Sequence, residues 1–485
     1  MRHRLEPIAS ERRARFRLTL PTILLPFLVV VLLGRGDRIR APLDEREADL
    51  ALASQPARWM AAGPAARPEI PWTPTTTAIS SIAPLALSSS ERNLRLPGVV
   101  AGAAAVALAV VLGERLYATR VGLLAAGLLL LLPAGPAILG ARLAVEPWFL
   151  CAMLVALVAI RDLDESRRSA SVAGLASGVA IALAGSDGLW LPALALAWLW
   201  TGRVLDLRAA AAVFVPCAVA ALALSATSAL AIGPAASLGT LATSLRSRQL
   251  APLSGSPAAL LLGFVPLLPL ALLGVARLPQ AWRSDDSLRF LLAWSLLAVL
   301  DLRLGRSGLP AWLAALYLVA TLAAWGLASV RWTTAIAGAV LAGVLAATLL
   351  PAPWPTSYRV PLESWAARET ARFLRRTMSP DTTIATTGHG VDRRLGYYGR
   401  REILAPEEAA TADVLVLGQD EFRARTAEPG GSGSDANPPS RPRMIAQFGP
   451  WVVARVKGHA TIRSPSLPGL AGSLPPRAAT TSKHE

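Results

Sequence analysis

Apolar runs of about 18 residues recur from residue 18 to residue 350, with short polar stretches between them. A helix of that length crosses a bilayer core of roughly 30 Å. Lipid offers the backbone no hydrogen-bond partners, so each crossing segment is expected to be helical. The pattern predicts a polytopic, mainly α membrane protein with about eleven spans, namely Leu18–Leu33, 97–113, 121–139, 147–160, 170–185, 188–201, 209–232, 257–276, 288–302, 309–328 and 332–350.

One polar segment, Gly34–Leu96, interrupts this pattern near the start. It is too long for a turn, and its mixed charges would be costly in hydrocarbon. We therefore expect the whole segment to lie at one membrane face. Acidic residues appear early in it, directly after the first span.

Arginine in the short loops predicts the orientation, because cytoplasmic loops carry an excess of Lys and Arg. The N-terminal residues 1–17 are basic, and Leu18–Leu33 is interpreted as a retained anchor because no small-residue cleavage site follows it. The N-terminus is then cytoplasmic, and residues 34–96 are extracytoplasmic. An odd number of spans places the C-terminus outside as well. The loops expected inside, all containing Arg, are 114–120, 161–168, 202–208, 277–289 and 330–331.

The chain changes character after Leu350. Helical apolar spacing appears over Leu362–Met378. Short strand-like runs follow, at Thr383–Thr387, Asp413–Leu417 and Trp451–Val456. The sequence thus predicts a transmembrane domain over 18–350, a small extracytoplasmic α/β domain over 351–458, and a disordered tail over 459–485 that is rich in Pro, Ser and Thr.

Composition agrees with a membrane protein and argues against a nucleic-acid partner. Of the 485 residues, 53% are hydrophobic and 16% charged, and the net charge is +16. The Arg residues cluster at span ends, where they set orientation and meet anionic lipid, and no nucleic-acid reader fold accompanies them. Cys151 and Cys217 lie inside apolar runs, as small buried hydrophobes do. The four His have no partners at metal-ligand spacing, so no metal ligand is assigned.

Three carboxylates are candidates for catalysis. Asp44 and Glu45 follow the first span, and Glu146 stands at the start of the span near 147. The predicted orientation puts all three on the outer side. Two carboxylates that converge on one cavity can share general-base work and substrate orientation. The alternative interpretation is a solvated loop face.

Three arginines, Arg95, Arg142 and Arg306, lie on the same predicted face at span boundaries. The planar guanidinium can donate two hydrogen bonds to a phosphate and keeps its charge. Taken singly, each could also be a side chain that reaches the interface from a helix end. As a set beside carboxylates they indicate a site for an anionic headgroup.

Several stretches resemble the membrane glycosyltransferases of the dolichyl-phosphate-mannose-protein mannosyltransferase type, which include the bacterial aminoarabinose transferases. The stretches are Leu43-Asp-Glu-Arg-Glu-Ala-Asp-Leu-Ala, Glu91-Arg-Asn-Leu-Arg-Leu-Pro and Leu304-Gly-Arg-Ser-Gly-Leu-Pro-Ala-Trp. The resemblance extends from Asp44 to about Val456. It includes Leu395-Gly-Tyr-Tyr-Gly-Arg, which looks like an aromatic-rich strand of that family.

The resemblance implies a GT-C fold in a bacterial cytoplasmic (inner) membrane. Such enzymes move a sugar from a polyprenyl-phosphate donor to a lipid, glycan or protein acceptor outside the membrane. The family's first-loop acid falls on Asp44 with Glu45 beside it, and its second acid falls on Glu146. Its loop arginines fall on Arg95 and Arg142, with Arg306 as a further phosphate contact. One displacement predicts inversion at the anomeric carbon. The resemblance requires no cofactor and leaves a divalent metal open.

Two departures from the family keep a second hypothesis open. Trp72-Thr-Pro-Thr stands where relatives carry a Lys-Pro-Pro-Leu-like stretch, so the Lys is missing. Glu146 replaces the usual Asp. The chain is therefore either a glycosyltransferase with a changed site or a non-catalytic relative that binds a polyprenyl lipid or an assembly partner. A third hypothesis is a transporter. The chain shows no internal repeat, which argues against that hypothesis.

Overall fold

The structure, a computed structural model, describes the chain in segments. They are residues 37–55, 70–86, 90–131, 137–163, 167–201, 207–232, 243, 246, 249–250, 267–281, 285–303, 308–328, 362–387, 391–404, 406–427 and 442–456. The chain divides into two compact units, and among the described residues the division falls between Trp365 and Ala366.

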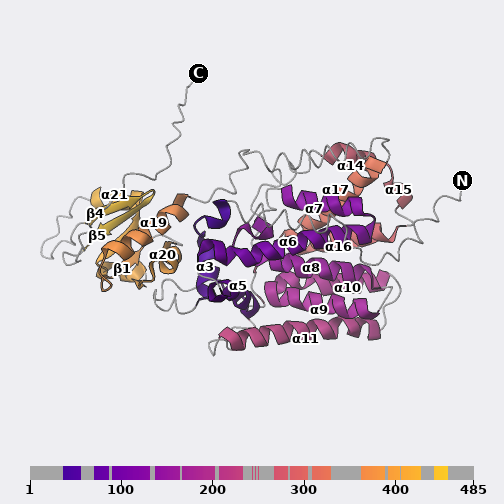
Figure 1. Cartoon of the computed structure of the whole chain (residues 1–485), viewed down its shortest axis with the longest axis horizontal. Coiled ribbons are helices and arrows are strands. Elements are labelled where there is room, and N and C mark those ends of the chain that lie inside the picture. Colours follow the sequence, from indigo (N-terminus) through magenta and orange to yellow (C-terminus); the bar gives the residue numbers. More distant parts are fainter. Residues whose placement is uncertain are drawn as a thin grey trace, which may run out of the picture. The chain divides into compact units, whose positions relative to one another are not determined.

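The regular secondary structure described for the first unit is all helical (Figure 1). Its elements are η2 (Asp37–Arg40), α3 (Glu45–Ala53), α5 (Pro74–Ala86), α6 (Glu91–Leu116), α7 (Thr119–Leu131), η4 (Ala137–Ala141), α8 (Glu146–Arg161), α9 (Arg167–Ala184), η5 (Ser186–Gly188), α10 (Trp190–Thr201), α11 (Leu207–Ile232), α14 (Leu268–Val275), α15 (Leu278–Ala281), α16 (Asp286–Arg303) and α17 (Leu309–Ala328).

A helix coincides, wholly or in part, with each predicted span between residues 97 and 328. Three described helices, Glu91–Leu116, Leu207–Ala229 and Leu309–Ala328, are long and apolar enough to cross a membrane by themselves. The predicted spans 18–33 and 332–350 lie outside the described residues, so the count of eleven stays a prediction. The fold is that of a multi-pass helical membrane protein.

The long helices pack side by side around one apolar core. Figure 1 shows α6, α8, α9 and α11 with nearly parallel axes, and each packs against the next. Trp294 and Tyr317 are among the largest fully buried side chains of the core. The Tyr317 hydroxyl donates to the Ala109 carbonyl at 2.7 Å, which joins α17 to α6 and satisfies a polar group in an apolar interior.

The described parts of the polar segment 34–96 are largely helical. They contain α3 and α5, and α6 begins at Glu91 instead of residue 97. The Ser90 hydroxyl accepts the Asn93 amide at 3.4 Å and so caps α6. Arg95 is consequently a helical residue, in the second turn of α6.

Two glycines let the chain before α8 press against α6. Gly140 has φ 101°, a conformation that favours glycine. A Cβ on Gly140 would lie 2.2 Å from the Gly98 carbonyl carbon, and one on Gly102 would lie 2.1 Å from the Leu139 oxygen. Because neither side chain exists, η4 and the loop after it lie directly on the first half of α6.

The second unit carries a five-stranded sheet of order β2-β1-β3-β5-β4. β1 pairs in parallel with β2 and β3, while β5 pairs antiparallel with β3 and β4. Three strands match predicted runs, and α19 matches the predicted helix. The elements are α19 (Leu362–Thr377), β1 (Ile384–Thr386), α20 (Val391–Gly399), β2 (Ile403–Leu404), η8 (Pro406–Thr411), β3 (Val414–Gly418), α21 (Gln419–Ala427), β4 (Arg443–Phe448) and β5 (Trp451–Arg455).

One prediction for this unit was wrong. The stretch 395–400, expected as an aromatic-rich strand, belongs to α20 up to Gly399. Leu395 and Tyr398 are three residues apart, so a helix places both on one face, and both pack in the same apolar cluster. The sheet here is completed instead by β2, which is only two residues long.

Candidate functional site

Asp44 holds the N-terminus of α3. Its Oδ1 accepts the Glu47 amide at 2.8 Å, and Glu47 Oε2 accepts the Asp44 amide at 3.0 Å. This reciprocal pair is a capping box, encoded by an N-cap Asp with Glu three residues later. Asp44 therefore has a fixed position, with Oδ2 turned away from the cap.

Glu47 connects this cap to two other segments. Its carboxylate accepts Arg95 Nε at 2.7 Å and Arg95 Nη2 at 2.6 Å, so the pair is bidentate. Its Oε1 also accepts the Leu143 amide at 2.6 Å. One buried side chain thus joins α3, the start of α6 and the loop before α8. Sequence reasoning missed Glu47, although Asp44-x-x-Glu47 carries the capping-box pattern that would have found it.

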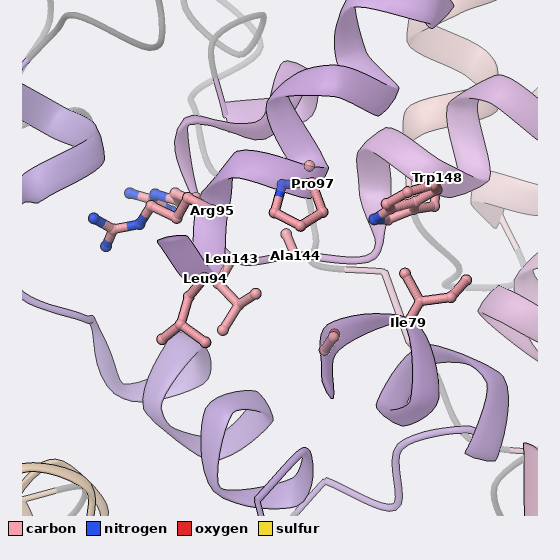
Figure 2. Close-up of a pocket in the computed structure, with 10 residues that line it drawn as sticks. Ile79, Leu94, Arg95, Pro97, Leu143, Ala144 and Trp148 are labelled. Atoms are coloured by element: carbon pink, nitrogen blue, oxygen red, sulfur yellow. The ribbon is translucent and has the colours of Figure 1, made fainter. Parts of the chain in front are cut away.

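Arg95 uses its remaining donors inside the protein. Its Nη1 donates to Ile39 O at 3.2 Å and to Ala41 O at 2.7 Å, and its Nη2 also approaches Pro42 O at 3.4 Å. The residue is 2% exposed. Figure 2 shows its side chain extending away from the Pro97 and Trp148 rings. The role of Arg95 at a donor phosphate stays a prediction, while in this structure Glu47 and backbone carbonyls accept from its guanidinium.

Arg142 is the basic side chain nearest to Asp44. Its Nη1 lies 3.8 Å from Asp44 Oδ2, and the two side chains are 40% and 24% exposed. Partial burial raises the pKa of the Asp44 carboxyl to about 6, and the negative charge of Glu47 adds to the rise. Arg142, the Glu47 amide and Arg95 act in the opposite direction. A carboxyl with a pKa of about 6 can exchange a proton near neutral pH.

Glu146 is the first residue of α8 and is 8% exposed. The loop before it is tied to the Asp44 cap through Arg142 and Leu143, so both acids lie at the same end of the helical unit. Glu45 follows Asp44 but is exposed. Arg306, the remaining predicted site residue, lies outside the described residues.

A narrow recess with a cavity volume of about 10 Å³, room for about one water molecule, lies beside this cluster. The loop after η4 and the first half of α6 form part of its wall, and α5 and α8 complete it. Figure 2 shows Ile79 and Trp148 on the same side of the recess, away from the Arg95 guanidinium. Its lining residues are Ile79, Ser80, Leu94, Arg95, Pro97, Gly98, Arg142, Leu143, Ala144 and Trp148.

A second buried polar network braces α3 from its other face. Asp49, 2% exposed, accepts the Trp72 indole N–H at 2.8 Å. The Arg46 guanidinium lies 5.1 Å from the Trp72 ring centre and donates to the Gln249 carbonyl. Asp187 Oδ2 in turn accepts the Gln249 amide at 3.2 Å. The stretch beginning at Trp72 thus supports α3.

The carboxylates of Asp44 and Glu47 leave few oxygens for a divalent metal. Both Glu47 oxygens accept N–H groups, and Asp44 Oδ1 does so too. Across the described segments, no three His, Cys, Asp or Glu side chains gather closely enough to hold an ion.

Comparison with known proteins was informative only at the level of structure. No protein-family model and no curated protein matches the chain. ArnT from Cupriavidus metallidurans is similar in its apo state (15% identity, TM-score 0.57, covering 89% of this chain and 97% of ArnT). Its structure bound to undecaprenyl phosphate gives 15% identity and a TM-score of 0.59, covering 90% and 98%.

The Archaeoglobus fulgidus oligosaccharyltransferase in complex with Zn and sulfate is also similar. The identity is 14% and the TM-score 0.52, covering 84% of this chain and 68% of that chain. The chain therefore has the fold of the GT-C membrane glycosyltransferases, as the sequence resemblance predicted.

Proposed function

We propose that this protein is a glycosyltransferase that moves a sugar from a polyprenyl-phosphate donor to an acceptor at the membrane face bearing Asp44, with inversion. The observation that carries the proposal is the Asp44–Arg142 pair, a proton-accepting carboxyl 3.8 Å from an exposed guanidinium. The fold supports it, because ArnT with that fold has been crystallised with undecaprenyl phosphate.

Asp44 is the general base of the proposed reaction. The acceptor oxygen bonds to the anomeric carbon while the bond from that carbon to the phosphate oxygen breaks. The acceptor proton passes to Asp44 Oδ2, and the polyprenyl phosphate leaves as an anion. Such proton transfer contributes typically 10²–10⁴-fold to a rate. A single displacement inverts the configuration at the carbon.

Arg142 is the proposed contact for the leaving phosphate, because its side chain is 40% exposed. A preorganised guanidinium stabilises the charge that develops there. Arg306 keeps the same proposed role. Arg95 instead positions Asp44 through Glu47, while Glu146 and Glu45 are proposed to orient the acceptor and the sugar.

The proposed setting is the bacterial cytoplasmic membrane, with Asp44 on the extracytoplasmic side. The α/β domain over 351–458 would lie on that side too. The proposed acceptor of the sugar is a lipid, a glycan or a protein. The oligosaccharyltransferase crystallised with Zn raises the question of a metal. The Asp44 and Glu47 carboxylates leave only Asp44 Oδ2 for an ion, so the proposed steps use the chain's own residues and a divalent metal stays open.

The test uses the purified full chain in liposomes with undecaprenyl-phosphate sugars and envelope lipid extracts as acceptors. We expect mass spectrometry to detect glycosylated product with the parent protein and none with Asp44→Asn. If the protein binds the donor but transfers none of the sugars supplied, the result would instead support the hypothesis of a non-catalytic relative.

A further inference from the structure

A second recess lies between α6, α8 and α9, away from the carboxylate site. It holds about 710 Å³ of empty space, part of it open to the surroundings. α8 packs against both α6 and α9 in the bundle (Figure 1). Its lining residues are Leu108, Val111, Arg115, Val155, Val158, Ala159, Asp162, Arg168, Ser169 and Val172.

The lining of this groove is segregated by polarity. Its apolar residues lie in the bodies of the helices, and its polar residues lie at their ends. Arg115 and Asp162 form an ion pair at 3.5 Å with side chains 40% and 19% exposed. Arg168 adds a second positive charge, and its side chain is exposed. Among the described lining residues, the polar end has two cations and one anion, an excess of one positive charge.

The position of the groove along α6 fixes its depth in the membrane. Arg95 and Arg115 lie on the same helix, 20 residues apart in number. At 1.5 Å per residue they are separated by about 30 Å, close to the thickness of the hydrocarbon core. Since Arg95 lies at the carboxylate site, the polar end of the groove reaches the opposite membrane face, at headgroup depth.

We infer that this groove binds an anionic glycerophospholipid from the leaflet opposite the carboxylate site. Arg115 and Arg168 contact the phosphate, for which a guanidinium fork is suited. The valine and leucine side chains of the groove contact the part of an acyl chain nearest the headgroup. A water-soluble anion would leave that wall uncovered, and a zwitterionic lipid would not use the excess charge. Basic groups at a membrane surface attract anionic lipid by about 1 kcal/mol each.

The experiment measures lipid binding to the purified full chain by native mass spectrometry, with phosphatidylglycerol and phosphatidylcholine as probes. We expect phosphatidylglycerol to bind at least about tenfold more tightly. The double variant Arg115→Ala/Arg168→Ala should lose that preference, since a hydrogen bond to a charged group is worth roughly 1.5–3 kcal/mol. The matched control is Arg277→Ala, which removes an exposed cation outside the groove.

Asp162→Asn separates a binding role from a structural one. It removes the anion that competes for Arg115, so phosphatidylglycerol should bind several-fold more tightly. If the Arg115–Asp162 pair served only to hold the helices, this variant would weaken binding together with stability. Thermal unfolding without added lipid identifies any variant that has simply lost its fold.

Three results would overturn the inference. They are equal binding of the two phospholipids, an equal loss in Arg277→Ala, and displacement of phosphatidylglycerol by undecaprenyl phosphate at lower concentration. The last would make the occupant a polyprenyl lipid.

Discussion

Glu47 and Arg95 form a bidentate ion pair that is almost completely buried, with side chains 4% and 2% exposed and a shortest distance of 2.6 Å. The two residues are 48 positions apart, in α3 and α6. Glu47 also orders Asp44 and Leu143 by accepting their amides. The pair thus sets the geometry in which Asp44 meets Arg142.

Removing one member of this pair should destabilise the protein strongly. Arg95→Ala leaves a buried carboxylate without its cation, and such losses cost about 3–5 kcal/mol. We expect a lower unfolding temperature and reduced yield in detergent. Arg92→Ala, an exposed change on the same helix, should stay within about 0.5 kcal/mol of the parent. A stable Arg95→Ala protein with only a raised KM for donor would return Arg95 to the phosphate.

The sequence predicted the helical unit well because apolar runs encode spans directly. It placed Asp44, Arg142 and Glu146 at one face, and the contacts of Arg142 and Leu143 with the α3 cap agree with that placement. It did not anticipate the partners of Arg95, because Glu47, Ile39 and Ala41 come together around it only through tertiary packing.

Local sequence patterns could not predict two other features. α20 contains two glycines and adjacent tyrosines, which favour neither helix nor strand clearly, and packing decided its structure. In the sequence, Gly98 and Gly140 are ordinary small residues within apolar stretches. Only the structure reveals that α6 and η4 touch there, which brings Arg142 to Asp44.

Transfer should fall as pH drops through about 6. The base must be ionised, and burial raises the Asp44 pKa to about 6, so the active fraction grows with pH through that value. Arg142 lowers this pKa, hence Arg142→Ala should move the acid limb upward. An exposed pair worth about 0.2–1 kcal/mol corresponds to about 0.1–0.7 pH unit. The measurement is kcat against pH, and a flat profile between pH 5 and 7 would exclude Asp44 as the titrating base.

Chelation should leave transfer unchanged within about twofold. Both Glu47 oxygens and Asp44 Oδ1 accept N–H groups, so of these four oxygens only Asp44 Oδ2 remains to bind an ion. The assay compares turnover after treatment with EDTA, and after readdition of Zn²⁺ or Mg²⁺. Activity lost to EDTA and restored by either ion would contradict this prediction and require ligands outside the described residues.

Thiol labelling tests the orientation. After replacement of Cys151 and Cys217 by Ala, a cysteine at the exposed Glu45 should react with an impermeant reagent in intact cells. A cysteine at the exposed Arg168 should react only after permeabilisation. The reverse pattern would place the carboxylate site on the cytoplasmic side.

The acid substitutions distinguish chemistry from folding. Asp44→Asn keeps a good N-cap side chain, so α3 should remain stable. It cannot accept the proton, and transfer should fall by about 10²–10⁴ with donor binding retained. Glu146→Gln should impair turnover, whereas Glu146→Asp restores the acid usual in the resembling family and should be tolerated. Asp286→Asn, at an exposed acid of α16 outside the site, is the matched control and should keep near-parental turnover.

Separate measurements of kcat and KM distinguish the role of the acids from that of Arg142. Loss of an interaction made only in the transition state lowers kcat and kcat/KM equally, as expected for Asp44→Asn. Arg142→Ala should raise the donor KM as well, because the guanidinium also contacts the bound phosphate before reaction. Equal losses of protein level in every variant would reveal a folding defect. Near-parental turnover by folded Asp44→Asn would remove Asp44 from the chemistry and leave Glu45 and Glu146 as the remaining predicted catalytic acids.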